Sequence, residues 1–159
     1  MNPGGPCGGA ACYTGGQLAR CSDSTLTQTT IVAGQIAGAR NYDIGHLNLG
    51  ADGGGLAAAG VGGAIKAEGC TGQVSPTGDA WGVDFVAHEI GHQFSADHTW
   101  NGTSGNCTDN NPAAASAVEP GSGSTIMGYA GICDDDNPQP HSDPYFSKRS
   151  QEQMYGRVD

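Results

Sequence analysis

The sequence predicts a protein of the α/β class, in its mixed α+β form, with a small core and many loops. Two hydrophobic periodicities support this class: residues 79–95 repeat apolar side chains at the 3.6-residue period of a helix, and residues 41–49 at the two-residue period of a strand. The length of 159 residues favours one domain. Its core is expected to be modest, because the chain has 28 Gly but only two Trp, five Tyr and three Phe.

The charge balance restricts the partners of this chain. Six Lys and Arg against 16 Asp and Glu give a net charge of -10, so no basic stripe is available to bind phosphates. Nucleic acids and anionic membrane surfaces are therefore unexpected partners. No apolar run approaches the length that spans a bilayer, since the longest candidate, residues 53–65, is mostly Gly and Ala.

Cysteine usage predicts an extracellular protein. Six cysteines in a small chain poor in lysine are typical of disulfide-bonded secreted proteins, and none forms a C-x-x-C pair. Their pairing stays open at this point, because six cysteines allow about 15 connectivities. Residues 1–6 lack the basic and apolar regions of a secretory signal, so the sequence as given contains no signal peptide.

The first half of the chain predicts one helix and two strands. Residues 1–24 are rich in Gly, Cys and Pro, which indicates a cross-linked or poorly ordered loop. A weakly amphipathic helix is expected from Ser24 or Thr25 to Arg40. A strand follows over 41–49, with Tyr42, Ile44 and His46 on one face, and the Gly-rich segment 50–55 ends it.

A second strand is predicted over Gly60–Ile65. Its glycines, Gly62 and Gly63, have no side chains and allow another backbone to approach closely. This suits an edge strand that pairs with an extended peptide.

Two helices are predicted in the second half of the chain. The first spans about 79–95, with capping side chains at 77–79 and an apolar stripe at Val83, Val86, Ile90 and Phe94. Residues 101–124 then indicate a long surface loop. The second helix covers 146–157, with Ser147 as its cap and with Met154 and Tyr155 expected to face inward.

The 79–95 helix contains a histidine pair with metal-binding spacing. His88 and His92 are four residues apart, so their imidazoles lie on one helical face, with Glu89 beside them. His98 reaches the same ion only if the chain turns sharply after the helix. Three nitrogen ligands with an open fourth position are typical of a catalytic zinc site. The alternative, polar histidines packed beside the core, requires this spacing to arise by chance.

These residues resemble the zinc motif of a known family. The run from His88 to His98 resembles the H-E-x-x-H-x-x-G-x-x-H motif of the metzincin metallopeptidases. Residues 124–129 are similar to the Met-turn of this clan, with Met127 as the turn methionine. Residues 146–150 resemble the start of the C-terminal helix in the reprolysin-like family, and 42–46 resemble a strand of its bacterial members.

The resemblance implies a metzincin-type zincin fold and a hydrolytic site. The fold would have a mixed, mostly parallel twisted sheet with an antiparallel edge strand, an active-site helix, a Met-turn and a C-terminal helix. One zinc ion would be held by His88, His92 and His98, with Glu89 as general base and Met127 as packing rather than ligand. Tyr129 would donate to the developing oxyanion, as an alternative to a buried tyrosine whose hydroxyl bonds elsewhere.

Three departures from the family pattern stand out. Ser95 occupies the position of the turn glycine, where positive φ costs a non-glycine residue about 1–2 kcal/mol, so we expect strain or a different turn. Arg149 replaces a cysteine, which removes one family disulfide. The family has further N-terminal strands and a helix, so 25–159 is interpreted as part of the catalytic domain, preceded by the Gly/Cys-rich segment 1–24.

Other candidate groups have weaker patterns. Asp134–Asp136 lacks the alternation of an EF-hand loop, so a solvated acidic turn is favoured over calcium, and His46 and His141 are interpreted as ordinary strand and loop histidines. Cys107 and Cys133 flank the segment between the histidine motif and the Met-turn, and we expect them to pair.

Together, the patterns predict a secreted, monomeric zinc metalloendopeptidase that acts on proteins or peptides. The alternatives are a catalytically silent zinc-binding module for extracellular interactions and a zinc hydrolase of non-peptide amides.

Overall fold

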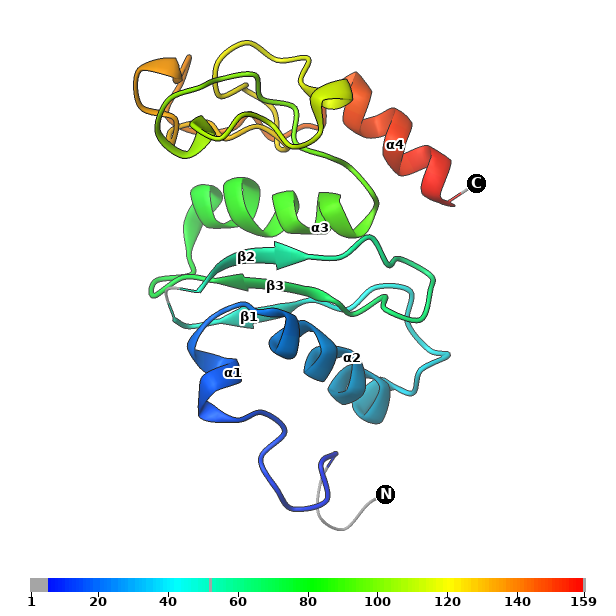
Figure 1. Cartoon of the computed structure of the whole chain (residues 1–159). Helices are drawn as coiled ribbons and strands as arrows, with labels where there is room; N and C mark the ends of the chain where they lie inside the picture. Colours follow the sequence, from blue (N-terminus) through cyan, green and yellow to red (C-terminus); the bar gives the residue numbers. More distant parts are fainter. Residues whose placement is uncertain (1–5, 52, 159) are drawn as a thin grey trace. The chain divides into compact units, whose positions relative to one another are not determined.

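A computed structural model describes residues 6–51 and 53–158 (Figure 1). The chain divides into two compact units, Met1–Pro76 and Thr77–Asp159. The composition-based division into a segment 1–24 and a domain 25–159 stays a prediction.

The first unit combines two helices with a mixed sheet. Its elements are α1 (Gly15–Ala19), α2 (Asp23–Ala37), β1 (Leu47–Leu49), β2 (Gly54–Ala57) and β3 (Gly69–Gly72). The strand order is β1-β3-β2, with β1 parallel and β2 antiparallel to the central β3. The helices lie on one side of the strands, where α2 packs against β3 (Figure 1). The predicted mixed sheet with an antiparallel edge strand is confirmed.

The N-terminal segment contains a helix that the sequence analysis missed. The Thr14 hydroxyl accepts a bond from the Gln17 backbone N–H, while the Gln17 side chain accepts one from the Thr14 N–H, so α1 begins with a complete capping box. The disulfide Cys7–Cys12 confirms that the preceding loop is cross-linked.

The helix expected from Ser24 or Thr25 to Arg40 is confirmed, with shifted ends. Ser22 caps α2 through a bond from the Thr25 N–H, and Gly38 ends the helix at a φ of 84°, a conformation that favours glycine. The core of this unit consists of Leu26, Leu49 and the disulfide Cys21–Cys70.

The two predicted strands are partly wrong. Within the predicted strand 41–49, only Leu47–Leu49 forms a strand, which pairs with β3. Gly60–Ile65 forms turns instead of an edge strand: the Gly63 N–H donates to the Gly60 carbonyl at 2.9 Å. The antiparallel edge is β2, which begins at the end of the Gly-rich segment 50–55 that was expected to terminate a strand.

The second unit is built on a long helix that confirms the prediction over 79–95. It begins with a π-helical segment, Ala80–Ala87, and continues as α3, His88–Gln93. The predicted loop over 101–124 is confirmed, and short 3₁₀ turns are its only regular helical elements within the described residues: Gly105–Cys107 and Ala114–Ser116. A further 3₁₀ turn covers Asp134–Asp136.

The C-terminal helix α4 spans Lys148–Val158, capped by the Ser147 hydroxyl, which accepts a bond from the Ser150 N–H at 3.1 Å. Met154 packs against the core as predicted, whereas the prediction for Tyr155 is wrong, since it is 62% exposed. The two residues are adjacent, so a helix directs them about 100° apart.

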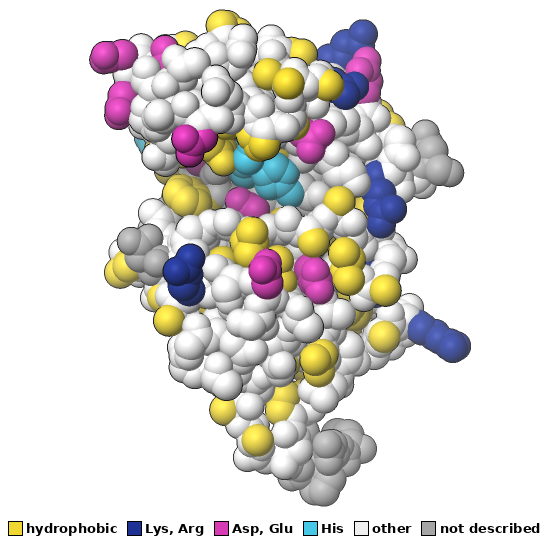
Figure 2. All heavy atoms as spheres, in the orientation of Figure 1, with side chains coloured by type: hydrophobic (Ala, Val, Ile, Leu, Met, Phe, Trp, Pro, Cys, Tyr) yellow, Lys and Arg dark blue, Asp and Glu magenta, His cyan; other side chains and the backbone are white. Residues whose placement is uncertain are grey.

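The expected pairing of Cys107 with Cys133 is confirmed. This disulfide packs with Trp100 and Tyr129 in a small hydrophobic cluster of the second unit. All six cysteines are in disulfides. On the face shown in Figure 2, Lys and Arg side chains form no continuous patch. Within the described part of the chain, every helix is too short or too polar to cross a membrane.

Candidate metal centre

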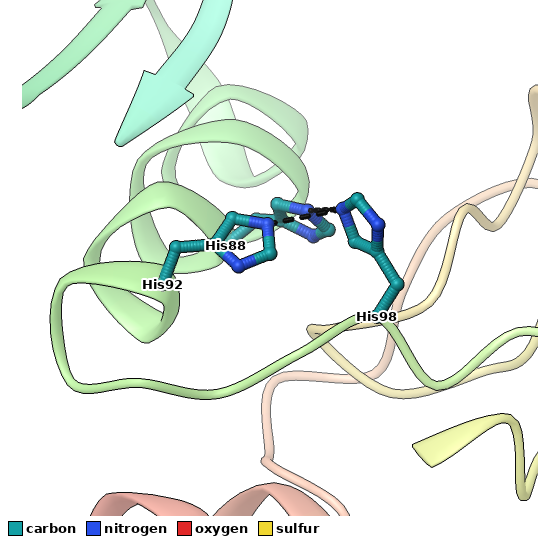
Figure 3. A group of neighbouring side chains, drawn as sticks. All are labelled: His88, His92 and His98. Carbon is teal, nitrogen blue, oxygen red and sulfur yellow. Dashed lines mark hydrogen bonds between the residues drawn. The ribbon is translucent and has the colours of Figure 1, made fainter. Parts of the chain in front are cut away.

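The imidazole rings of His88, His92 and His98 cluster in the second unit, with their candidate ligand atoms within 4.8 Å of one another (Figure 3). His88 and His92 lie one turn apart on α3, and His98 lies on the segment that follows it. The Nε2 atom of His98 is 3.0 Å from that of His92 and 3.2 Å from that of His88. The predicted three-histidine cluster is thus present, and it is the group suited to a metal ion among the described residues.

A sharp turn after α3 brings His98 back to the helix. Ser95, at the position where the family motif has glycine, adopts a φ of 72°, which is the left-handed conformation. The turn is closed by bonds from the Ser95 N–H to the His92 carbonyl at 2.8 Å and from the Ala96 N–H to the Gly91 carbonyl at 2.9 Å. The chain therefore makes a tight turn here, with serine in a conformation that favours glycine.

Backbone carbonyls orient two of the rings. The Nδ1 of His88 lies 2.7 Å from the Ile126 carbonyl, and that of His92 lies 2.7 Å from the Ala96 carbonyl. A carbonyl only accepts, so each Nδ1 carries the proton and each Nε2 presents its lone pair to the cluster. This arrangement is usual for histidines that bind metal.

The donor set fits a divalent cation. With both helical Nε2 atoms deprotonated, the Nε2 of His98 can donate to only one of them, so at least one lone pair in the cluster is left without a proton. Burial, with the neighbouring imidazoles, lowers the pKa of His88 to about 3 and that of His98 to about 4. Burial also lowers the pKa of His92. Neutral imidazoles in this arrangement match the nitrogen ligands of zinc.

Two further predicted residues lie beside the cluster. Glu89 is 9% exposed, and burial raises the pKa of its carboxyl to about 7. The ring of Tyr129 lies 4.6 Å from that of His98 and 5.7 Å from that of His88, centroid to centroid. Burial, followed by the charge of Glu89, raises the pKa of Tyr129 to about 12.

Met127 packs against the helix that bears His88 and His92. It is fully buried, and a Cβ added to Gly91 on α3 would overlap its sulfur. A turn shapes this segment, since the Gly128 N–H donates to the Thr125 carbonyl at 2.8 Å. Met127 therefore packs directly against α3.

The remaining candidates are not members of the cluster. His46 bonds to the Thr71 hydroxyl at 2.6 Å in the first unit, and His141 bonds to the Asp84 carboxylate at 2.8 Å. Asp136 accepts bonds from the backbone N–H groups of residues 103 and 104, which lower the pKa of this carboxyl. Asp134–Asp136 therefore acts as a loop-capping acidic turn.

The sequence analysis missed Glu119 and Thr99. The Glu119 carboxylate accepts bonds from Thr99 beside the third histidine and from residues 124 and 125 at the start of the Met-turn. No local pattern marks this glutamate, which stands alone in a loop between Val118 and Pro120.

A helical histidine pair, a third histidine after a tight turn and a buried methionine packed against the helix are the features of the metzincin metallopeptidases. Comparison with protein families shows that the chain belongs to the metallo-peptidase family M12B, reprolysin-like, whose profile matches residues 14–154. We found no curated protein and no solved structure that matches the chain. Membership of this family implies zinc as the metal.

Proposed function

We propose that this chain is a secreted zinc endopeptidase in which Glu89 acts as the general base. The observation that supports it most strongly is the convergence of the Nε2 atoms of His88, His92 and His98, with Glu89 next to the first of them. His88 is buried, whereas His92 and His98 are only partly buried, so the cluster is not sealed from solvent.

The three imidazoles would hold the ion. When bound, zinc would supply the Lewis acidity needed to polarise a peptide carbonyl and to acidify water. Glu89 accepts the proton of the attacking water and returns it to the amine of the leaving peptide. Its sheltered position, at 9% exposure, favours proton transfer to substrate over exchange with bulk solvent.

Tyr129 is proposed as the donor to the oxyanion that forms on the substrate carbonyl. Its ring packs on the stacked Trp100 at 5.3 Å and against His98, so the hydroxyl is carried by a rigid support. Burial keeps the phenol protonated, with a pKa of about 12, and thus able to donate at neutral pH.

Secretion is supported by the three disulfides, since such bonds persist in oxidising compartments. The proposed substrates are proteins or peptides, in keeping with the family.

The proposal is tested on the oxidised 159-residue chain by measuring zinc content and cleavage of casein with and without 1,10-phenanthroline. We expect about one zinc per chain and cleavage that the chelator abolishes. The variant Glu89→Ala should retain zinc and lose at least about 100-fold in kcat, since general bases contribute 10²–10⁴-fold. Glu152→Ala, which removes an exposed glutamate of α4, is the matched control and should cleave normally.

Stoichiometric zinc without chelator-sensitive cleavage would instead identify the silent zinc-binding module. Unchanged turnover in Glu89→Ala would exclude the general-base role while leaving the zinc site in place.

A further inference from the structure

The Glu119 carboxylate is surrounded by hydrogen-bond donors. One oxygen accepts bonds from the backbone N–H groups of Ser124 at 3.0 Å and Thr125 at 3.1 Å. The other accepts from the hydroxyls of Thr125, at 2.6 Å, and Thr99. All of these partners are uncharged hydrogen-bond donors. Such donors stabilise Glu119 as an anionic carboxylate and would not bind a cation.

One side of this network holds the residue after His98. Thr99 donates its hydroxyl to the Glu119 carboxylate and its carbonyl accepts the Glu119 N–H at 2.9 Å. Its own N–H donates to the Met127 carbonyl at 3.0 Å. Thr99 is fully buried, and its hydroxyl, carbonyl and N–H are all hydrogen-bonded. These bonds hold in place the backbone next to His98.

The other side holds the carbonyl that orients His88. Thr125, bound by the carboxylate through both its N–H and its hydroxyl, immediately precedes Ile126. The Ile126 carbonyl accepts the Nδ1–H of His88 at 2.7 Å. A single carboxylate therefore joins the backbone segments that place the first and third imidazoles.

We propose that Glu119 is the positioning residue of the metal centre: its carboxylate holds Thr99 and Thr125 so that His88 and His98 are set for the ion before it binds. The inference rests on the proposed function for the identity of the ion. Ser95, in the turn that precedes His98, has a left-handed conformation that a non-glycine residue keeps only where the surrounding structure holds it, so contacts on both sides of the turn are needed.

The test measures zinc affinity by chelator competition, the visible spectrum of the cobalt(II)-substituted protein, and the thermal unfolding midpoint of the metal-free protein. Thr99→Val removes one donor while keeping the side-chain shape. Thr29→Val is the matched control, because Thr29 is also buried but donates its hydroxyl to the Thr25 carbonyl in α2.

We expect Thr99→Val to weaken zinc binding by about 10- to 100-fold and to change the cobalt spectrum, as outer-shell changes do. Thr29→Val should lower the unfolding midpoint and leave zinc affinity and spectrum unchanged. Glu119→Ala should weaken zinc binding more than Thr99→Val does. Glu119→Gln should recover most of the affinity, because its amide oxygen still accepts the two backbone N–H groups and the threonine hydroxyls can rotate to accept its NH₂.

Wild-type zinc affinity and an unchanged cobalt spectrum in Thr99→Val would overturn the inference, and this variant decides the matter if Glu119→Ala does not fold. A wild-type chain that binds zinc tightly but does not cleave casein would contradict the proposed peptidase, while the zinc affinities of the variants would still support or refute the role of Glu119. A wild-type chain that binds no zinc would overturn both.

Discussion

Gly91 lies directly against the side chain of Met127, so that the helix bearing two of the histidines rests on the turn beneath it without an intervening side chain. A Cβ at position 91 would overlap the methionine sulfur and come within 2.9 Å of the Phe146 ring. Met127 is fully buried and cannot swing into solvent to make room. The close approach therefore depends on glycine at this position.

Gly91→Ala should accordingly destabilise the protein by about 1–3 kcal/mol, the usual range for overpacking a core. Denaturant unfolding of the metal-free protein measures this. Gly82→Ala is the control, since a Cβ there meets nothing within 4 Å and alanine is favoured in helices, so no loss is expected. Equal losses in both variants would contradict the packing explanation.

Ser95→Gly should stabilise the protein by about 1 kcal/mol. Serine at a φ of 72° incurs the left-handed penalty that glycine avoids, and the gain is reduced by the greater freedom of glycine in the unfolded chain. Ser95→Ala should give little change, because alanine has the same penalty. Denaturant midpoints of the three proteins provide the comparison, and a destabilised glycine variant would show that the serine side chain compensates for its backbone.

Tyr129→Phe should lower kcat by at least about tenfold and leave KM and zinc content nearly unchanged. The phenylalanine ring keeps the contacts with Trp100 and His98 but has no hydroxyl to donate to the oxyanion. Steady-state kinetics on a fluorogenic peptide library separate the two constants. A variant with wild-type kcat would assign Tyr129 to packing alone.

The stability contributed by Glu119 should depend on pH. Burial by itself raises the pKa of this carboxyl, but the hydroxyl and backbone N–H groups bound to it together lower it below 4.5. A lowered folded-state pKa means that the stabilisation is present above pH 4.5 and is lost as pH falls through the folded value. The difference in unfolding free energy between metal-free wild type and Glu119→Gln should therefore shrink below pH 4.5. A difference that stays constant from pH 7 to about 3 would show that charge is not involved.

Local sequence patterns predicted the helices well and the strands poorly. The helix over 79–95 follows from an apolar stripe contained within the segment itself. The edge strand β2, by contrast, contains two glycines and exists because it pairs with the distant β3, which shows no alternation of its own. Pairing of this kind depends on the partner strand, which a local pattern does not contain.

In the metal centre, too, residues within one helix were predictable from the sequence, whereas residues brought together by the fold were not. His88, Glu89 and His92 could be predicted from spacing on one helix, whereas the contribution of His98 required a turn at Ser95 that only the family resemblance implied. The capping box of Thr14 and Gln17 had a visible signature that was overlooked in a Gly-rich segment. Glu119 had none, since its role arises from three loop segments that meet only in the folded chain.

The acceptors that orient His88 and His92 are main-chain carbonyls, those of Ile126 and Ala96. Every amino acid supplies the same carbonyl, so substitutions at 96 and 126 that preserve the backbone path leave ring orientation untouched. Directed evolution of this scaffold can thus vary the side chains around the metal for new selectivity, while the orientation of two of its three ligands remains a property of the backbone.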